Sequence, residues 1–158
     1  MSAQQTPQEY FRLLLLTVVG QAFEAAGYTL EQRPMQWAGG MFRFAKGLDG
    51  GLNAFIEFQV LSYVDTEWAA RNPSRFRVTL TRSDQAAPST PSQHPRFARR
   101  DLSALVVEDF GVAILPSAGH WWTFSNTDEL GRGLAEAGHL IVGYGMPWLA
   151  GDLLPPSG

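Results

Sequence analysis

Two segments that alternate apolar and polar residues flank a glycine-rich turn, and together they constrain the fold more than any other part of the chain. They read MFRFAKGLDGGLNAFIEFQVLSYV, residues 41–64, with Asp-Gly-Gly at 49–51. Glycine and aspartate tolerate the positive φ angles of tight turns, so the pattern predicts a β-hairpin. A three-residue loop places Phe44 opposite Ile56, whereas a two-residue loop places Arg43 on the face of Ile56. Because a one-residue slip exchanges the two faces of a strand, the apolar match selects the three-residue loop.

This register gives the predicted sheet two faces of unlike composition. It places Arg43 opposite Glu57, with Gln59 next along the same face, and predicts an exposed ion pair worth about 0.2–1 kcal/mol. A further strand is predicted at residues 75–82, where Phe, Val and Leu alternate with arginine and threonine. One face is therefore apolar, and the other carries most of the charge.

The N-terminal part of the chain predicts a long helix over residues 7–26. Thr6 and Glu9 form a capping box around a proline at the first helical position, and Gly27 is a natural stop. The helix is apolar on most sides, which predicts that it is covered on more than one side. Either a second helix lies on it beside the sheet, or a second copy of the chain does.

A second helix is predicted from Asn126, which forms another capping box with Glu129. Apolar residues then recur at spacings of four and three, which indicates a single buried stripe. Gly145 and Pro147 are expected to end this helix. Residues 151–158 are expected to form a tail.

These elements predict an α+β fold with an antiparallel sheet of about four to five strands, and an N-terminal and a C-terminal helix packed on one face. The expected organisation is a single domain over residues 1–158 with its core at about 7–150. Residues 65–73 are read as a short helical turn. Residues 84–98 hold three prolines, are called here the proline-rich loop, and are read as an exposed, mobile loop. Residues 102–115 are read as a strand pair or irregular strand, with a short helix over 101–109 as the alternative.

Two adjacent tryptophans, Trp121 and Trp122, lie in the segment HWWTF, which is read as a final strand. Neighbouring residues of a strand point to opposite faces, so one indole joins the core and the other lies on the polar face. Tryptophan and arginine are enriched in protein interfaces, so this face is the candidate binding surface. The alternatives are a solvated sheet face or one covered by the proline-rich loop. The candidate binding residues are Trp121, Trp122, Arg43, Glu57, Gln59, Arg75, Arg77 and Tyr63.

Charge is distributed unevenly along a chain whose net charge is −3. Residues 71–100 hold seven arginines against one aspartate, a balance of +6, whereas the remainder holds five basic and fourteen acidic residues, a balance of −9. Such a segment is typical of an anion-binding face, with Arg96, Arg99 and Arg100 as candidates. The alternative is that these arginines pair with the acidic helices.

Catalytic and metal-binding patterns are not found in the sequence. There is no cysteine, and the three histidines, His94, His120 and His139, have no carboxylate or second histidine at ligand spacing. No catalytic residue, metal site or cofactor is therefore assigned. Glu57 is the one carboxylate in the middle of a predicted strand, and it could serve as a general acid or base only if burial shifted its pKa.

The order of short motifs resembles an uncharacterised family of small bacterial domains, grouped only as a domain of unknown function. The motifs are AAGY, FRF, FIEFQ, FRVTL, WWTF and a closing GMPWL, spanning roughly residues 8–150. The segment SDQAAPSTPSQHPRFARR has no counterpart in that pattern. The resemblance implies an α+β architecture and a bacterial origin, and it implies no activity.

Three functions remain open at this point. The favoured one is a non-enzymatic protein-interaction module, of accessory or toxin-immunity type, with another protein or a second copy as partner. The second is an anionic-ligand or nucleic-acid binder, which the single lysine and the negative net charge disfavour. The third is a small enzyme using Glu57, Arg43 and a histidine. The apolar run in the first helix is too short to span a bilayer, and together with the absence of cysteine it predicts a cytoplasmic protein.

Overall fold

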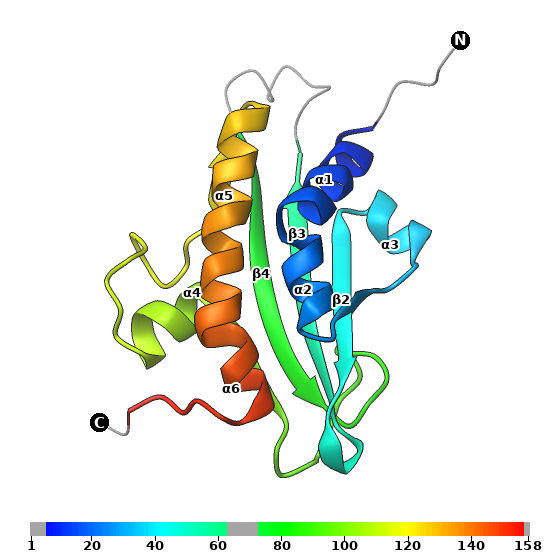
Figure 1. The fold of residues 1–158 in the computed structure, drawn as a ribbon, viewed down its shortest axis with the longest axis vertical. Helices are drawn as coiled ribbons and strands as arrows, with labels where there is room; N and C mark the ends of the chain where they lie inside the picture. The colour runs from blue at the N-terminus through cyan, green and yellow to red at the C-terminus, as the bar shows by residue number, and fades with distance from the viewer. Residues whose placement is uncertain (1–5, 63–72, 157–158) are drawn as a thin grey trace.

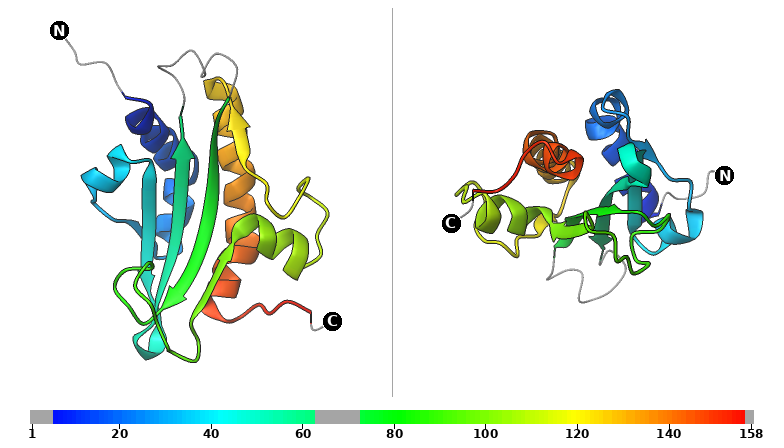
Figure 2. Two further views of the ribbon diagram at one scale, coloured as in Figure 1. Left: turned by 180° about the vertical axis from the view of Figure 1, so that it is seen from behind. Right: turned by 90° about the horizontal axis from the view of Figure 1, so that it is seen from below.

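The computed structural model describes residues 6–62 and 73–156. In these residues six strands form one antiparallel sheet, and two helical rods lie side by side on one of its faces (Figures 1 and 2). The strands are β1 (Thr29–Leu30), β2 (Met41–Gly47), β3 (Asn53–Leu61), β4 (Ser74–Ser83), β5 (Ala98–Asp101) and β6 (Trp122–Phe124). The predicted α+β class and the placement of both helices are confirmed.

The predicted hairpin register is confirmed residue by residue. Phe44 pairs with Ile56 and Arg43 with Glu57 across β2 and β3. The turn Asp49–Gly51 has φ angles of 74° and 76° at its two glycines, which residues with a side chain rarely adopt. β4 then pairs with β3 along its whole length, so the three longest strands form the centre of the sheet.

Two short strands share the edge of β4 away from β3: β6, which lies in the predicted final strand HWWTF, and β5, which was not predicted. β6 pairs with residues 74–76, and β5 pairs with residues 79–82. The result is a sheet of order β1-β2-β3-β4-β5, with β6 beside the first half of β4.

The N-terminal rod consists of α1 (Pro7–Leu15), a π-helical segment η1 (Leu16–Gly20) and α2 (Gln21–Ala25). The Thr6 hydroxyl accepts a hydrogen bond from the Glu9 amide at 3.1 Å, which confirms the predicted cap. The C-terminal helix packs on this rod, which is the first of the two predicted ways of covering it. The two approach so closely that a Cβ added at Gly138 would lie 2.8 Å from Val19 Cγ1.

The C-terminal rod consists of α5 (Thr127–Leu140), the π-helical segment η5 (Ile141–Gly145) and α6 (Met146–Ala150). Its Asn126 cap is as predicted, with the Glu129 amide 2.9 Å from the Asn126 side chain. The predicted stop at Gly145 and Pro147 is wrong, because the rod continues to Ala150 and ends at Gly151, with φ 83°. A wide π turn just before the proline leaves room for its ring, so the helix is not broken there.

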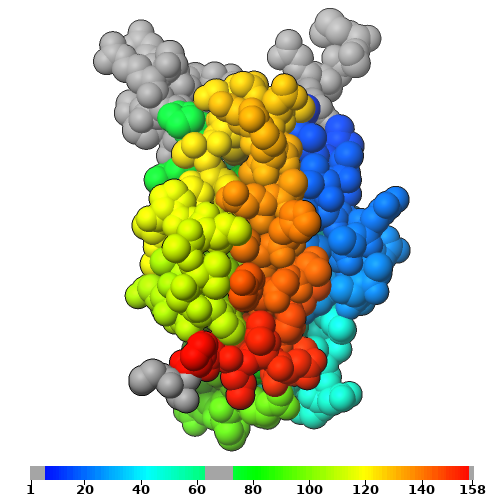
Figure 3. Space-filling view, turned by 60° about the vertical axis from the view of Figure 1, so that its left-hand side comes forward, coloured from blue at the N-terminus to red at the C-terminus, as the bar shows by residue number. Residues whose placement is uncertain are grey.

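The favoured strand assignment for residues 102–115 is also wrong. After β5 the chain forms α4 (Leu102–Ala104) and the π-helical segment η4 (Leu105–Asp109), which is the alternative that the sequence left open. Leu102, Leu105 and Val106 are fully buried, at the spacing of one helix face. Burial of this face outweighs the strand preference of the β-branched residues. In Figure 3 this segment and the following loop flank the C-terminal rod.

Aromatic rings fill the space between the rods and the sheet. Phe11 of α1 lies 5.3 Å from Phe42 and 5.5 Å from Phe76, measured between ring centroids. The short helix α3 (Pro34–Ala38) adds Trp37 at the edge of this cluster. Leu149 of α6 is fully buried, and Trp148 of the same helix packs against the core. No helix within the described ranges is long and apolar enough to cross a membrane.

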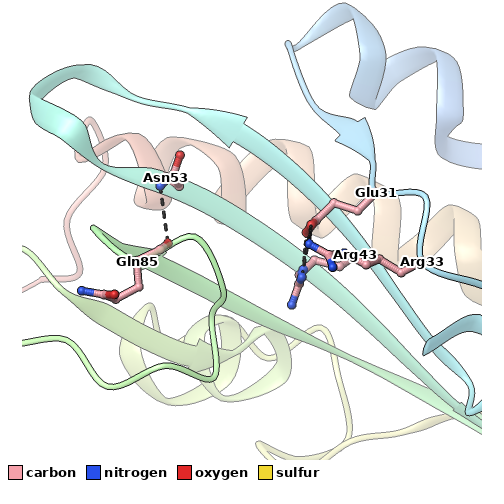
Figure 4. A network of polar contacts seen from close by, with 5 residues as sticks. All are labelled: Glu31, Arg33, Arg43, Asn53 and Gln85. Atoms are coloured by element: carbon pink, nitrogen blue, oxygen red, sulfur yellow. Dashed lines mark hydrogen bonds and ion pairs between the residues drawn. The ribbon is translucent and has the colours of Figure 1, made fainter. Parts of the chain in front are cut away.

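The proline-rich loop is largely exposed, as predicted, but it also contacts the sheet. Pro88 is buried, and its carbonyl oxygen accepts a hydrogen bond from Arg99 at 3.4 Å. Gln85 O accepts another from Asn53 at 3.4 Å (Figure 4). The loop therefore folds against one end of the sheet, on the face away from the rods (Figure 2). The helical turn predicted at 65–73 falls almost entirely outside the described residues.

Candidate binding face

The sheet face opposite the rods, called here the outer face, gathers most of the predicted binding residues. The register aligns Arg43 with Glu57, and Gln59 with Arg77, so that their side chains lie on one side of the sheet. Arg75 follows two residues before Arg77 on the same side. Trp121 joins them through its contacts with both arginines. Trp122 does not belong to this face, and Tyr63 lies outside the described residues.

The two tryptophans point in opposite directions, as predicted. Trp122 is 5% exposed and stacks on Phe76 with ring centroids 5.3 Å apart. Its indole Nε1 donates a hydrogen bond to Glu136 of α5 at 2.9 Å, so its one polar atom is satisfied inside the fold. Trp121 is half-buried and lies one residue before β6.

Trp121 contacts two guanidinium groups. The Arg75 guanidinium carbon lies 4.3 Å from the indole centroid, and that of Arg77 lies 4.8 Å from it. Arg77 is further positioned by Gln59, whose Oε1 accepts a hydrogen bond from Arg77 Nε at 3.0 Å. We call Trp121, Arg75, Arg77 and Gln59 the Trp121 patch. Cation–π contacts of this kind are worth about 0.5–1 kcal/mol when partly exposed.

Arg43 is not part of the exposed ion pair that its register predicted. It is 5% exposed, and its guanidinium forms a two-pronged ion pair with Glu31, with Nη2 3.1 Å from Oε2 (Figure 4). The chain after β1 runs beside β2, where the Glu31 amide donates to the Arg43 carbonyl at 2.8 Å. That backbone hydrogen bond brings the Glu31 carboxylate to Arg43. The spacing of the two residues in the sequence does not predict this ion pair.

Glu57 is 9% exposed, directly opposite Arg43 in the register. Burial raises its pKa above the ordinary value of 4.5, while the nearby Arg99 and Arg43 oppose the rise and Glu31 adds to it. A raised pKa is a property that catalytic acids share, yet no hydrogen bond within the described ranges joins Glu57 to a histidine. The side chain is a buried acid. Its cross-strand neighbour Thr79 pairs in turn with Asp101, and the Thr79 hydroxyl donates a hydrogen bond to the Asp101 carboxylate at 3.1 Å.

The end of the outer face next to the hairpin turn is closed. Phe55 and Thr81 point away from the rods, yet they are 3% and 0% exposed. Their position beside Arg99, which is bonded to the Pro88 carbonyl, shows that the proline-rich loop covers them. The Thr81 hydroxyl has no hydrogen-bond partner among the described residues. The sequence left two alternatives to a binding surface, a solvated face and a face covered by the proline-rich loop. Coverage by the loop applies to this end of the face.

The arginines proposed for anion binding do not form one surface. Successive residues of β5 point to opposite faces, so Arg99 lies on the outer face and Arg100 on the other. Arg100 makes a two-pronged contact with Asp109, at 2.9 and 3.0 Å. Arg96 lies near the end of α6, with Nη2 2.8 Å from a Cβ built at Gly151. Arg82, from the same basic segment, donates to two carbonyls of α6, each at 3.1 Å. Several of these arginines are therefore used within the fold.

The histidines are scattered. His94 accepts a backbone hydrogen bond within the proline-rich loop, His139 is exposed on α5, and His120 packs edge-on against Trp122 at 4.9 Å. Burial lowers the pKa of His120. Within residues 6–62 and 73–156, no three His, Cys, Asp or Glu side chains are grouped so that they could hold a metal ion.

Comparisons with known proteins add no candidate residue to this face. No family model, curated protein or solved structure matches the chain.

Proposed function

We propose that this chain is a non-enzymatic protein-interaction module, and that the Trp121 patch on the outer face is its binding site. The observation that carries the proposal is the difference in burial between two adjacent tryptophans. Trp122 is buried with its indole N–H bonded to Glu136, whereas Trp121 is half-buried against two arginines.

The energetics of protein interfaces support this site. Tryptophan and arginine are the residue types whose truncation most often costs 2 kcal/mol or more of binding free energy. Binding also costs side-chain entropy, and part of it is already lost in the free protein, because Gln59 and Trp121 hold Arg77 in place. The patch is thus prepared for contact before any partner arrives.

The alternative of a small enzyme has less support. Its proposed residues were Glu57, Arg43 and a histidine, but Arg43 is neutralised by Glu31. A general acid needs a donor–acceptor geometry toward a reacting group as well as a shifted pKa. Glu57 instead lies opposite Arg43 in the sheet, where Arg43 and Arg99 partly offset the burial of its charge, an arrangement that needs no substrate.

The proposal includes an accessory or toxin-immunity role in a bacterial cytoplasm. It draws on the absence of cysteine, which suits a reducing compartment. The dominance of arginine over lysine is typical of GC-rich bacterial genomes.

Site-specific photocrosslinking in cells tests the proposal. A photoreactive amino acid replaces Thr123, which is exposed and pairs with Arg75, so the probe borders the patch without removing Trp121. The matched control carries the same probe at the exposed His139 on α5. We expect a discrete adduct from position 123 that disappears when Trp121→Ala is added, and no such adduct from position 139. An adduct of twice the monomer mass would identify the partner as a second copy.

Equal labelling from both positions, or an adduct that survives Trp121→Ala, would contradict the proposed function. Melting curves of each variant confirm that the fold persists, so a lost adduct reports binding and not unfolding.

A further inference from the structure

Three arginines of the described residues form ion pairs. Arg33 and Arg43 each contact Glu31, and Arg100 contacts Glu108 and Asp109. Arg75 and Arg77 form none, because no carboxylate in the described residues lies within 4.0 Å of either guanidinium. The Trp121 patch is therefore a positive surface on a chain whose net charge is −3.

Both guanidiniums have unused hydrogen-bonding capacity. Arg75 Nε is buried and has no hydrogen-bond partner in the described part of the chain. Arg77 uses its Nε on Gln59, and no hydrogen bond from its two terminal nitrogens is found there. An arginine presents five N–H groups in a planar fork that matches a carboxylate in two-pronged fashion. Each arginine of the patch can thus receive one carboxylate without losing a contact made inside the fold.

Strand geometry sets the spacing of these two positions. Arg75 and Arg77 are two residues apart in β4 and face the same side, so their Cα atoms are about 6.5–7 Å apart. Alternate residues of any extended peptide have that same spacing and that same common side. Trp121 lies against both guanidiniums, and its indole adds an apolar surface to the patch.

We propose that the partner presents an extended acidic segment to this patch, with two carboxylates two residues apart that pair with Arg75 and Arg77. This inference rests on the proposed function and names the chemistry of the partner. The segment lies along β4, and its apolar atoms cover the indole of Trp121.

Charge favours protein carboxylates over a nucleic acid at this site. Affinity for a phosphate backbone depends on many cation contacts, and the patch supplies two. The other arginines on the outer face are used internally, as Arg43 is by Glu31 and Arg99 by the Pro88 carbonyl. The rest of the chain is acidic and repels a long polyanion, whereas a short acidic segment meets only the patch.

Short, end-blocked peptides test the spacing directly. Each is built of Ser, Thr and Gly and carries two Glu residues that are adjacent, two apart or four apart, with Gln versions of each as controls. Binding to the full chain is followed through the indole N–H signals in a proton–nitrogen NMR spectrum, assigned by Trp121→Phe and Trp122→Phe. We expect the peptide with Glu residues two apart to bind best and to shift the Trp121 signal while the Trp122 signal stays in place.

Variants of the protein provide the second arm. Arg75→Gln combined with Arg77→Gln is expected to weaken binding of that peptide by about tenfold or more, the scale of lost hydrogen bonds to a charged group. Arg132→Gln, at an exposed arginine of α5, removes the same charge elsewhere and is expected to leave binding unchanged. Equal binding of the Gln peptides, or tighter binding of a short thymidine oligonucleotide, would overturn the acidic-segment inference.

The two proposals fail separately. If the Gln peptides bind as well as the Glu peptides while the Trp121-dependent adduct at position 123 persists, the interaction function stands and the acidic partner does not. If the adduct is absent while the Glu peptides still bind through Arg75 and Arg77, the specificity of the patch stands and the proposed function in cells does not.

Discussion

Trp121 and Trp122 have the same side chain and adjacent positions, yet they belong to different environments. Trp122 is 5% exposed, stacked on Phe76 and bonded to Glu136. Trp121 lies against the guanidinium groups of Arg75 and Arg77 on the other side of the sheet. The difference shows that strand alternation, and not residue type, decides whether an indole stabilises the core or borders a surface.

The same contrast extends to the faces on which they lie. The apolar residues of the inner face are buried under the two helical rods. The outer face has a closed end, where Phe55 and Thr81 are covered by the proline-rich loop, and a half-exposed end at the Trp121 patch. The outer face is therefore not one continuous surface, because the proline-rich loop covers part of it.

The largest effect is expected from Trp122→Ala. Removing a buried indole leaves a cavity beside Phe76 and an unpaired Glu136, and we expect a loss of about 3–5 kcal/mol in the free energy of unfolding. Trp121→Ala is the matched comparison, and it is expected to cost about 1 kcal/mol, the scale of partly exposed cation–π contacts. Urea denaturation of both variants measures the difference. Equal losses would mean that both rings are core residues and that the patch is covered.

An intermediate effect is expected from Glu31→Gln, which tests the ion pair between Glu31 and the buried Arg43 on the outer face. Arg43 is 5% exposed and would lose its charged partner, so we expect a loss of about 1–3 kcal/mol. The lower part of that range reflects the 19% exposure of Glu31, which allows water to compensate. Arg33→Gln is the control, because that arginine is 56% exposed and 3.6 Å from the same carboxylate. A Glu31→Gln variant as stable as the Arg33→Gln variant would contradict the buried pair.

The smallest effect is expected from Glu57→Gln, and its sign depends on pH. Burial raises the pKa of Glu57 in the folded state above 4.5, so the folded state binds this proton more readily than the unfolded state. The corresponding stability is present in full below the unfolded pKa and is lost as pH rises through the folded pKa. Because glutamine does not ionise, we expect the variant to be more stable than the native chain at pH 7, with the difference vanishing near pH 4.

Urea denaturation at both pH values checks this prediction. Glu24→Gln, on the exposed side of α2, serves as the control for removing a carboxylate. A Glu57→Gln variant that is less stable at pH 7 would show that the attraction of Arg43 and Arg99 outweighs the burial of the carboxyl.

The central sheet and the two rods were predictable because their signals are local. The turn at residues 49–51 and the alternation around it determine the register, and capping residues three positions apart mark the start of each rod. The opposite orientation of Trp121 and Trp122 followed from the same alternation. These patterns require only neighbours in sequence, so no tertiary information was needed.

What the sequence alone determined is thus the α+β class, the hairpin register and the division of the sheet into an apolar and a polar face. The tertiary structure decided the rest. The Glu31 carboxylate lies at Arg43 because the Glu31 amide is hydrogen-bonded to the Arg43 carbonyl. Residues 102–109 are helical because Leu102, Leu105 and Val106 are buried together on one helix face. Pro88, which is bonded to Arg99, covers one end of the outer face. Each of these contacts joins segments whose approach depends on how the whole chain packs, and the free energy of such packing outweighs local preference.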